Sequence, residues 1–211
     1  LSQALLLQTS KVLAERDPEA ELTPEQTQQI QNLVVAAINS ATRATQLNPS
    51  FAPNWSLRGS VYRDVMSLVN NANSLSAASF TRAAELDPFN PVHLTNIARV
   101  NLDVADRARS LKASDNAELA AQAVEVEKTE LASAEEQLNK AIALKGGYAP
   151  AHYYLAAVFE RQGKLQEALA RMAALRNYAP LDVGIGFQLS LLALRVGNYD
   201  LAQAELERVI S

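Results

Sequence analysis

A seven-residue stretch near the end of the chain returns 34 residues later, and its neighbours stay in register. Residues 163–169 (GKLQEAL) align with residues 197–203 (GNYDLAQ), and the same offset relates Leu155 to Leu189, Arg161 to Arg195, Met172 to Leu206 and Leu175 to Val209. A fixed period of this length is typical of stacked supersecondary units, none of which buries its apolar face alone. The sequence therefore predicts a tandem array of helical hairpins, whose function resides on the surface that the stack creates.

The composition suits a helical protein with a buried core. Of the 211 residues, 48% are hydrophobic and 20% are charged, a balance unlike that of disordered chains. The net charge of -4 provides no basic stripe to displace counterions from phosphates, so nucleic acid is not expected as a partner. The chain has no cysteine, which excludes disulfides, thiolate zinc sites and cysteine nucleophiles.

The two ends of the chain indicate a piece of a longer protein. The apolar run at residues 4–7 is far shorter than the ~20 residues of a membrane-spanning helix, so this fragment is not expected to insert into a membrane. The chain does not begin with methionine, and it stops at Ser211 without the polar capping helix with which solenoids normally end. Self-association through this uncapped C-terminal end is therefore one hypothesis.

Apolar spacing and turn residues divide the chain into ten helices, with no strand alternation. One helix start is especially clear, because Thr23 can cap it, Pro24 suits its first turn and Gln26 completes a capping box. The expected helices occupy residues 1–16 (broken by Asp17-Pro18) and 23–47, 53–70 and 74–86, 91–111 and 115–144, 149–162 and 164–178, and 181–196 and 199–210.

The first full hairpin carries a recognisable pattern. Residues 55–62 (WSLRGSVY) contain an aromatic, then leucine and glycine, then tyrosine at set intervals, and residues 80–88 (FTRAAELDP) form a second helix closed by proline. This pattern resembles the tetratricopeptide repeat (TPR), and the resemblance covers residues 37–211. It implies an all-α, right-handed superhelix in one domain, made of about five antiparallel hairpins at residues 1–50, 51–90, 91–148, 149–182 and 183–211, the last of them truncated.

Small residues mark the expected helix crossings. Gly59, Ala98, Ala156 and Ser190 are placed where the two helices of a hairpin meet, since small side chains allow backbones to approach to the ~8 to 10 Å of packed helices. Three second helices are expected to end because proline follows them, at Pro49, Pro88 and Pro180.

Several departures from the pattern predict local differences. Arg58 replaces an expected leucine, which suggests a slightly rotated first hairpin, and Gly146-Gly147 replaces a closing Asp-Pro, which suggests a softer junction. Residues 101–134 exceed the pattern by 24 positions, and residues 62–76 exceed it by five. The longer excess, shared between two helices, would project that hairpin by roughly 15 Å.

A second resemblance concerns the N-terminal part of the chain. Residues 22–25, 32–34, 44–50 and 54–55 look like the soluble repeat region that follows the membrane domain in bacterial O-antigen ligase or polymerase-like proteins. This resemblance implies a bacterial, extracytoplasmic accessory domain of a polysaccharide-assembly membrane protein. In that alternative the parent protein is an enzyme and the repeats position its polymer or a companion subunit.

No constellation in the sequence points to catalysis, a metal or a cofactor. Trp55 occupies a core position of its helix, and His93 and His152 lack partners at ligand spacing, so all three are interpreted as structural or solvated. The acid pairs Glu125/Glu127 and Glu135-Glu136 are interpreted as a hydrated helix face. Phosphate loops, dinucleotide fingerprints and nucleophile elbows are missing, so this fragment is expected to be non-catalytic.

The expected site is a concave groove, which in TPR proteins is lined by the first helix of each hairpin. In this sequence those positions are Ser56, Ser60 and Arg63; Thr95, Asn96, Arg99 and Leu102; Tyr153, Ala157, Glu160 and Arg161; and Phe187, Gln188, Leu191, Leu194 and Arg195. We expect a scaffold that binds a peptide or partner helix, with arginines 63, 99 and 195 meeting acidic groups and with Tyr153 and Phe187 as apolar anchors. Alternatively, Phe187 and Leu191 belong to an apolar face that a further repeat would cover.

One binding mode of TPR proteins is not supported. Chaperone-binding members hold a terminal carboxylate with basic and asparagine side chains at set positions. Asn96 matches one such position, but Ser56, Ser60, Pro150 and Tyr154 occupy the others.

Overall fold

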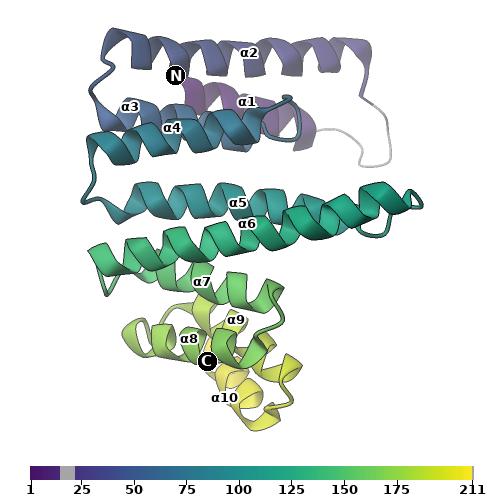
Figure 1. The fold of residues 1–211 in the computed structure, drawn as a ribbon, viewed down its shortest axis with the longest axis vertical. Helices are drawn as coiled ribbons and strands as arrows, with labels where there is room; N and C mark the ends of the chain where they lie inside the picture. The colour runs from purple at the N-terminus through teal and green to yellow at the C-terminus, as the bar shows by residue number, and fades with distance from the viewer. Residues whose placement is uncertain (15–21, 211) are drawn as a thin grey trace. The chain divides into compact units, whose positions relative to one another are not determined.

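The computed structural model describes residues 1–14 and 22–210, and this part of the chain forms ten α-helices and no strand (Figure 1). The helices are α1 (Ser2–Ala14), α2 (Pro24–Leu47), α3 (Ala52–Asp64), α4 (Ala72–Leu86), α5 (Pro91–Leu111), α6 (Ala117–Leu144), α7 (Ala149–Arg161), α8 (Leu165–Tyr178), α9 (Val183–Arg195) and α10 (Tyr199–Ile210). Consecutive helices pack as hairpins, which confirms the predicted all-α fold. The expected helix end at residues 15–18 lies outside the described residues.

The helices gather into two compact units, residues Leu1–Phe89 and Asn90–Ser211, called here the N-terminal and C-terminal units. The assignment of the whole chain to one solenoid domain stays a prediction. None of the helices in the described ranges combines the length and apolar character needed to traverse a bilayer.

In the N-terminal unit, α2 begins as the sequence predicts. The Gln26 N–H donates to the Thr23 hydroxyl at 3.2 Å, and the Thr23 N–H donates to the Gln26 side chain at 2.9 Å. This reciprocal capping box satisfies two backbone donors that a helix start leaves without intrahelical partners. Further along α2, Ala37 and Ala41 form a buried cluster with Val61 of α3.

The prediction that a helix extends over residues 53–70 is wrong. Helix α3 ends at Asp64, and residues 65–71 form a turn in which Val65 and Met66 are 1% and 6% exposed. The turn closes at Asn71, whose φ of 59° lies in the left-handed region that asparagine tolerates. The extra residues therefore fold back and bury two apolar side chains instead of lengthening the helix into water.

The predicted helix crossings are confirmed. A Cβ atom added to Gly59 would lie 2.9 Å from the Phe80 ring, so the two helices approach too closely for a larger residue. The Ser76 hydroxyl also donates to the Gly59 carbonyl at 2.7 Å. The equivalent residues Ala98, Ala156 and Ser190 are 0%, 1% and 0% exposed.

In the C-terminal unit, the 34-residue repeat appears as two equivalent turns. Gly163 and Gly197 have φ angles of +78° and +79°. After each glycine, the next N–H donates to a carbonyl five residues earlier, from Lys164 to Phe159 at 2.9 Å and from Asn198 to Ala193 at 2.8 Å. This bonding is the Schellman pattern, which ends a helix at a left-handed glycine.

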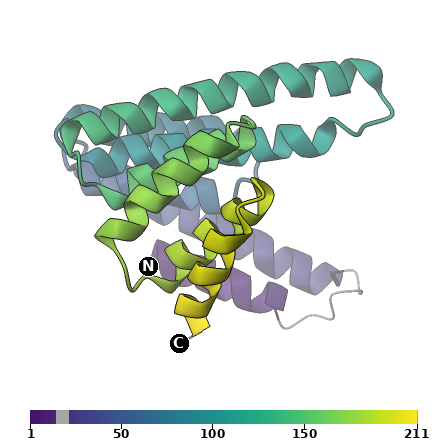
Figure 2. The same ribbon diagram turned by 90° about the horizontal axis from the view of Figure 1, so that it is seen from below.

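The hairpin of α5 and α6 is elongated, as the sequence predicts. These helices have 21 and 28 residues, against 13 and 14 in α7 and α8. At 1.5 Å per residue, the extra length amounts to roughly 12 and 21 Å. Figures 1 and 2 both show the far ends of α5 and α6 extending together beyond α7. Apart from the end of α3, the described helix boundaries agree with the predicted ones to within two residues.

The elongated hairpin and α7 share one core. The helices contribute Ala98, Leu102 and Ala105 from α5, Leu131, Ala134, Leu138 and Ala141 from α6, and Ala151, Leu155 and Val158 from α7. A second cluster joins α7, α8 and α9 through Ala156, Ala168, Met172, Leu175, Ile185, Leu189 and Leu192. These two cores hold the first helices α5, α7 and α9 in consecutive positions.

Candidate functional site

Helices α5, α7 and α9, the first helices of three consecutive hairpins, surround a cavity of about 600 Å³ in the C-terminal unit. It is called the polar groove here, and it is lined by Arg99, Leu102, Asp103, Asp106 and Arg109 of α5, by Tyr153, Tyr154, Ala157, Glu160 and Arg161 of α7, and by Gln188 and Arg195 of α9. Eight of the residues expected in a groove line this one cavity: Arg99, Leu102, Tyr153, Ala157, Glu160, Arg161, Gln188 and Arg195.

A second cavity, of about 390 Å³, adjoins the polar groove and is called the apolar cavity. It is lined by Ala149, Pro150, Tyr153, Tyr154, Leu175, Asp182, Gly184, Ile185, Phe187 and Gln188. Tyr153, Tyr154 and Gln188 line both cavities. The two tyrosine rings meet edge to face, with centroids 5.5 Å apart and an interplanar angle of 88°. The two cavities are therefore neighbouring parts of one surface, joined at an aromatic pair.

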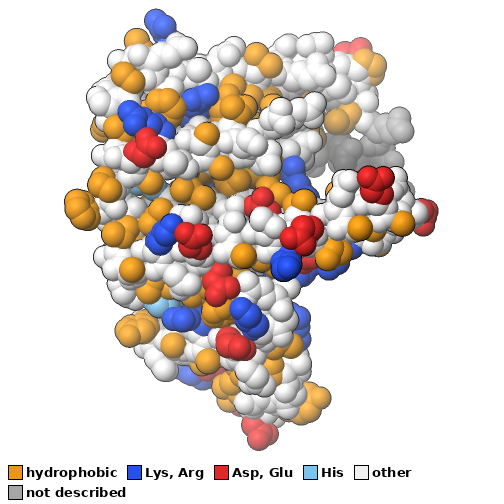
Figure 3. All heavy atoms as spheres, viewed as in Figure 1, with side chains coloured by type: hydrophobic (Ala, Val, Ile, Leu, Met, Phe, Trp, Pro, Cys, Tyr) orange, Lys and Arg blue, Asp and Glu red, His pale blue; other side chains and the backbone are white. Residues whose placement is uncertain are grey.

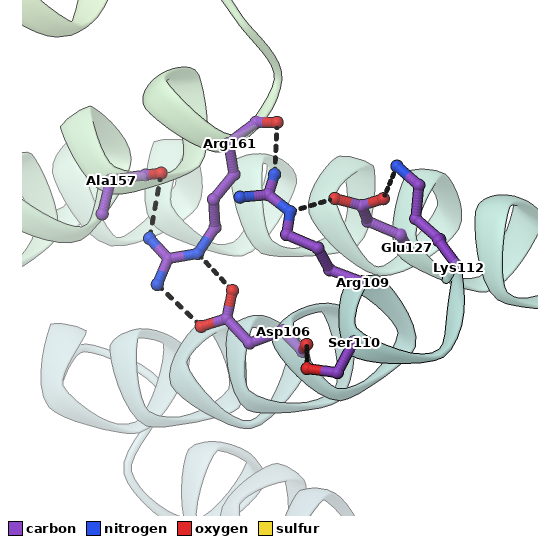
Figure 4. A network of polar contacts seen from close by, with 7 residues as sticks. All are labelled: Asp106, Arg109, Ser110, Lys112, Glu127, Ala157 and Arg161. Atoms are coloured by element: carbon purple, nitrogen blue, oxygen red, sulfur yellow. Dashed lines mark hydrogen bonds and ion pairs between the residues drawn. The ribbon is translucent and has the colours of Figure 1, made fainter. Parts of the chain in front are cut away.

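One wall of the polar groove is held by a two-pronged ion pair between α5 and α7. Nε and Nη2 of Arg161 donate to the two carboxylate oxygens of Asp106 at 2.6 and 2.7 Å (Figure 4). The hydrogen bond to Asp106 raises the pKa of Arg161 above its ordinary value, and burial opposes this only in part. The guanidinium is therefore charged, and its two parallel hydrogen bonds to one carboxylate fix its orientation.

Behind this wall lies a buried carboxylate from α6. Glu127 is 6% exposed and accepts from Arg109 Nε at 2.7 Å and from Lys112 Nζ at 2.8 Å (Figure 4). Burial alone would raise the pKa of Glu127, but hydrogen bonds and charges from Lys112 and Arg109 outweigh it and hold this pKa below its ordinary value. Arg109 also donates to the Arg161 carbonyl at 2.7 Å, which links the long hairpin to the end of α7.

The interpretation of Glu127 as part of a hydrated face is therefore wrong. The sequence does contain a signal, because Glu127 falls on the apolar stripe of α6, between Ala123 and Leu131. An acid at such a position needs a cationic partner within hydrogen-bond distance. Which cation supplies it follows only from the packing of α5 against α6.

A further ion pair connects α7 to α9. Arg195 pairs with Glu160, two residues that the sequence places in the groove to face a partner. In the structure these two charges pair with each other at the polar groove, not with a partner protein. The space-filling view shows the same mixture more widely, with basic and acidic side chains interspersed over the C-terminal unit (Figure 3).

Arg99 differs from the other arginines of the groove. Its Nη1 donates to the Asn96 side chain at 3.3 Å, and its guanidinium carbon lies 5.2 Å from the centroid of the Tyr154 ring. Within the described ranges, no carboxylate forms an ion pair with Arg99, whereas Arg109, Arg161 and Arg195 each have one. Asn96 itself does not line the groove and instead orients Arg99.

The remaining groove predictions have varied outcomes. Thr95 does not face the groove, because it is 3% exposed and donates to the Pro91 carbonyl within its own helix. Phe187, 46% exposed, lines the apolar cavity, whereas Leu191 and Leu194 are 38% and 43% exposed and line neither cavity.

The predicted residues Ser56, Ser60 and Arg63 belong to α3 of the N-terminal unit. There, Arg63 pairs with its neighbour Asp64 at 3.5 Å. The partner-binding role of all these residues stays a prediction.

The residues interpreted as structural have packing or backbone partners. The indole N–H of half-buried Trp55 donates to the Pro49 carbonyl at 2.8 Å, and Arg58 lies 5.5 Å from the Trp55 ring centroid. His93 is 4% exposed, and Nε2 of His152 lies 2.7 Å from the Gly146 carbonyl oxygen. Among the described residues, no group of three or more histidine or acidic side chains is arranged to hold a metal ion.

Helical hairpins with small residues at their crossings, and with first helices lining one groove, define a TPR-like helical repeat. The fold agrees with solved TPR structures. A thermophilic TPR protein from Thermus thermophilus superposes with a TM-score of 0.63 at 17% identity, over 100% of this chain and 90% of that one.

MamA proteins are similar to the chain as well. One MamA structure has a TM-score of 0.61 at 16% identity, over 90% of this chain and 95% of that one. MamA from Desulfovibrio magneticus has a TM-score of 0.60 at 11% identity, over 99% and 93%. At these identities the likeness establishes the fold alone.

Comparisons of sequence find neither a matching protein-family model nor a matching curated protein. The resemblance of the N-terminal part to O-antigen ligase-like proteins therefore stays a prediction, as does the extracytoplasmic location that it implies.

Proposed function

We propose that this chain is a non-catalytic protein-interaction module that binds a peptide or a partner helix from another protein in the groove of α5, α7 and α9. The observation that carries the proposal is the junction of a charged groove with an apolar cavity at Tyr153 and Tyr154. Binding surfaces between proteins concentrate their energy in such places, where aromatic and arginine side chains surround a pocket.

The exposure of the aromatic anchors supports this proposal. Phe187 is 46% exposed and lines the apolar cavity together with Tyr153. A ligand side chain that entered the apolar cavity would cover Phe187 and Tyr153 together. The apolar area thereby removed from water would stabilise the complex, at ~25 cal/mol per Å² before the costs of association are subtracted.

The arrangement of charges supports binding more than catalysis. Asp106 and Glu160 are engaged by Arg161 and Arg195. A general acid or base must be free to exchange its proton with a substrate, and an arginine-bound carboxylate is poorly suited to that task. Fixed charge pairs instead provide a rigid, polar rim around an apolar anchor site.

A displayed library of random peptides, selected on the purified chain, tests the proposal. We expect the selected peptides to lose about tenfold or more in affinity for Tyr153→Ala and Phe187→Ala, as measured by fluorescence anisotropy. The matched control is Tyr178→Ala, which removes an 83% exposed aromatic that lines neither cavity. Selected peptides that bind all three variants as tightly as the original chain would exclude the groove as the binding site.

A further inference from the structure

We infer that the groove selects an extended peptide with an acidic side chain at one position and a bulky apolar side chain two positions away. In this inference, which rests on the proposed function, Arg99 binds the acidic group and the apolar cavity beside Phe187 receives the other side chain.

The acidic preference follows from the pairing of the groove arginines. Arg109, Arg161 and Arg195 already share ion pairs with Glu127, Asp106 and Glu160. A ligand carboxylate at any of these would have to compete with the resident acid. Arg99 donates a hydrogen bond to an amide oxygen and lies over an aromatic ring, both neutral, and no carboxylate in the described part of the chain pairs with it. A ligand carboxylate therefore gains a charge-assisted hydrogen bond there without displacing another.

The position of the acidic group relative to the apolar one follows from the tyrosine pair. Arg99 lies over the Tyr154 ring, and the Tyr154 ring meets the Tyr153 ring at a centroid distance of 5.5 Å. Tyr153 in turn lines the apolar cavity together with Phe187. Because Tyr154 itself lines both cavities, one aromatic ring separates Arg99 from the apolar cavity, and we assign this span to side chains i and i+2 on one face of an extended chain, which are ~7 Å apart.

Gln188 supports an extended ligand backbone. It is half-buried and lines both cavities, and its side-chain amide forms no hydrogen bond with any residue in the described part of the chain. An amide offers both a donor and an acceptor. The peptide group between the two anchored side chains of an extended ligand presents the complementary carbonyl and N–H at the same place.

The ion pairs that join the three groove helices also favour a slim ligand. Arg161 joins α7 to α5, and Arg195 joins α7 to α9. A partner helix with its side chains is ~10 to 12 Å across, whereas an extended strand is narrower and needs less room between helices that are tied together in this way.

The charge of Asp182 determines which of the two subsites receives the acidic side chain of the ligand. Asp182 lines the apolar cavity, and its carboxylate accepts from the Ile185 N–H at 3.0 Å, which holds it at the start of α9. A second carboxylate from the ligand would be repelled there. The acidic side chain is therefore directed to Arg99 and the uncharged one to the apolar cavity.

Synthetic peptides with Glu at position i and Phe at position i+2, in an otherwise uncharged background, test the inference by fluorescence anisotropy. We expect these to bind about tenfold more tightly than peptides with Gln in place of Glu, and more tightly than peptides with the two residues adjacent or four apart. Arg99→Gln is expected to abolish the Glu-over-Gln preference, and Arg99→Lys to retain part of it. Arg43→Gln, which removes an exposed arginine of the N-terminal unit, should change nothing.

The outcomes separate this inference from the proposed function. Peptides that bind through Phe187 but show no Glu preference, or a preference that survives Arg99→Gln, overturn the role of Arg99 and leave the interaction module intact. Tightest binding at a spacing of four residues indicates a helical ligand and overturns the extended one. If neither Phe187→Ala nor Arg99→Gln alters the binding of any peptide, the groove itself is excluded. Circular dichroism melting of each variant identifies any loss that is due to unfolding.

Discussion

The carboxylate of Asp106 on α5 and the guanidinium of Arg161 on α7 are joined by two hydrogen bonds of 2.6 and 2.7 Å at the wall of the polar groove. The two residues are 55 positions apart in the chain. Their side chains are 44% and 26% exposed, so water screens the pair only in part. This contact makes the groove wall a point where the elongated hairpin and the regular repeat stabilise each other.

Replacing Asp106 should therefore cost stability. Asp106→Asn leaves Arg161 charged beside a neutral amide, and we expect the free energy of unfolding to fall by ~1 kcal/mol, measured by urea denaturation. The control is Glu136→Gln, which breaks the exposed pair with Lys140 and should cost less than ~0.5 kcal/mol. Equal losses in the two variants would contradict a special role for the groove pair.

Low pH should destabilise the far part of the elongated hairpin by protonating the carboxylate of Glu127. Because the pKa of Glu127 in the folded protein lies below its ordinary value of about 4.5, its contribution to stability is present above about pH 4.5 and is lost as the pH falls through the lowered pKa. At neutral pH we expect Glu127→Gln to destabilise the protein by ~1 to 3 kcal/mol. Urea denaturation at a series of pH values should show this difference shrinking in acid. A difference that does not change with pH would rule out Glu127 as the titrating group.

The close crossing of α3 and α4 predicts an asymmetric response to added methyl groups. Gly59→Ala places a Cβ atom 2.9 Å from the Phe80 ring, so we expect a loss of ~1 to 3 kcal/mol in thermal or urea unfolding. Gly146→Ala is the matched control, since no atom lies within 4 Å of its added Cβ and its φ is not positive. It should be neutral or slightly stabilising, by up to ~1 kcal/mol. A Gly59→Ala variant as stable as the original chain would refute the close contact.

A buried ion pair joins α8 to α10, and we expect that removing one of its two members is costly. Arg176 and Glu205 are each 5% exposed and lie 2.8 Å apart, and Arg176 also donates to the Asp182 carbonyl. Glu205→Ala leaves the Arg176 charge buried without its carboxylate, and we expect a loss of ~3 to 5 kcal/mol. The double variant Arg176→Leu with Glu205→Leu should be more stable than Glu205→Ala.

Denaturation of these variants alongside Asp200→Ala, an exposed site on the same helix, measures the effect. Equal stability of Glu205→Ala and Asp200→Ala would show that the buried pair does not matter.

Much of this fold is determined by short stretches of sequence. The capping box at Thr23 and Gln26 and the left-handed turns at Gly163 and Gly197 depend on residues only a few positions apart. The spacing of small residues such as Ala98 and Ser190 likewise predicts which side of a helix is buried. Such features are readable from sequence because one local segment holds all the atoms that take part.

The composition of the candidate groove was partly predictable for a related reason. Once the first helices are recognised, the repeat places Arg99, Tyr153, Glu160 and Arg195 on one surface, and the structure finds them lining one cavity. Their binding role stays a prediction. The sequence alone does not show that Glu160 and Arg195 pair with each other, which leaves Arg99 as the groove arginine without an acidic partner in the described chain.

Only the tertiary structure decided which charges meet. Glu127 lies on an apolar stripe, and the packing of α5 against α6 brings Arg109 and Lys112 to it. The same is true of residues 65–71, whose fold depends on whether Val65 and Met66 can be buried. Ion pairing and burial depend on distances in space between segments far apart in sequence, and a local pattern does not contain those distances.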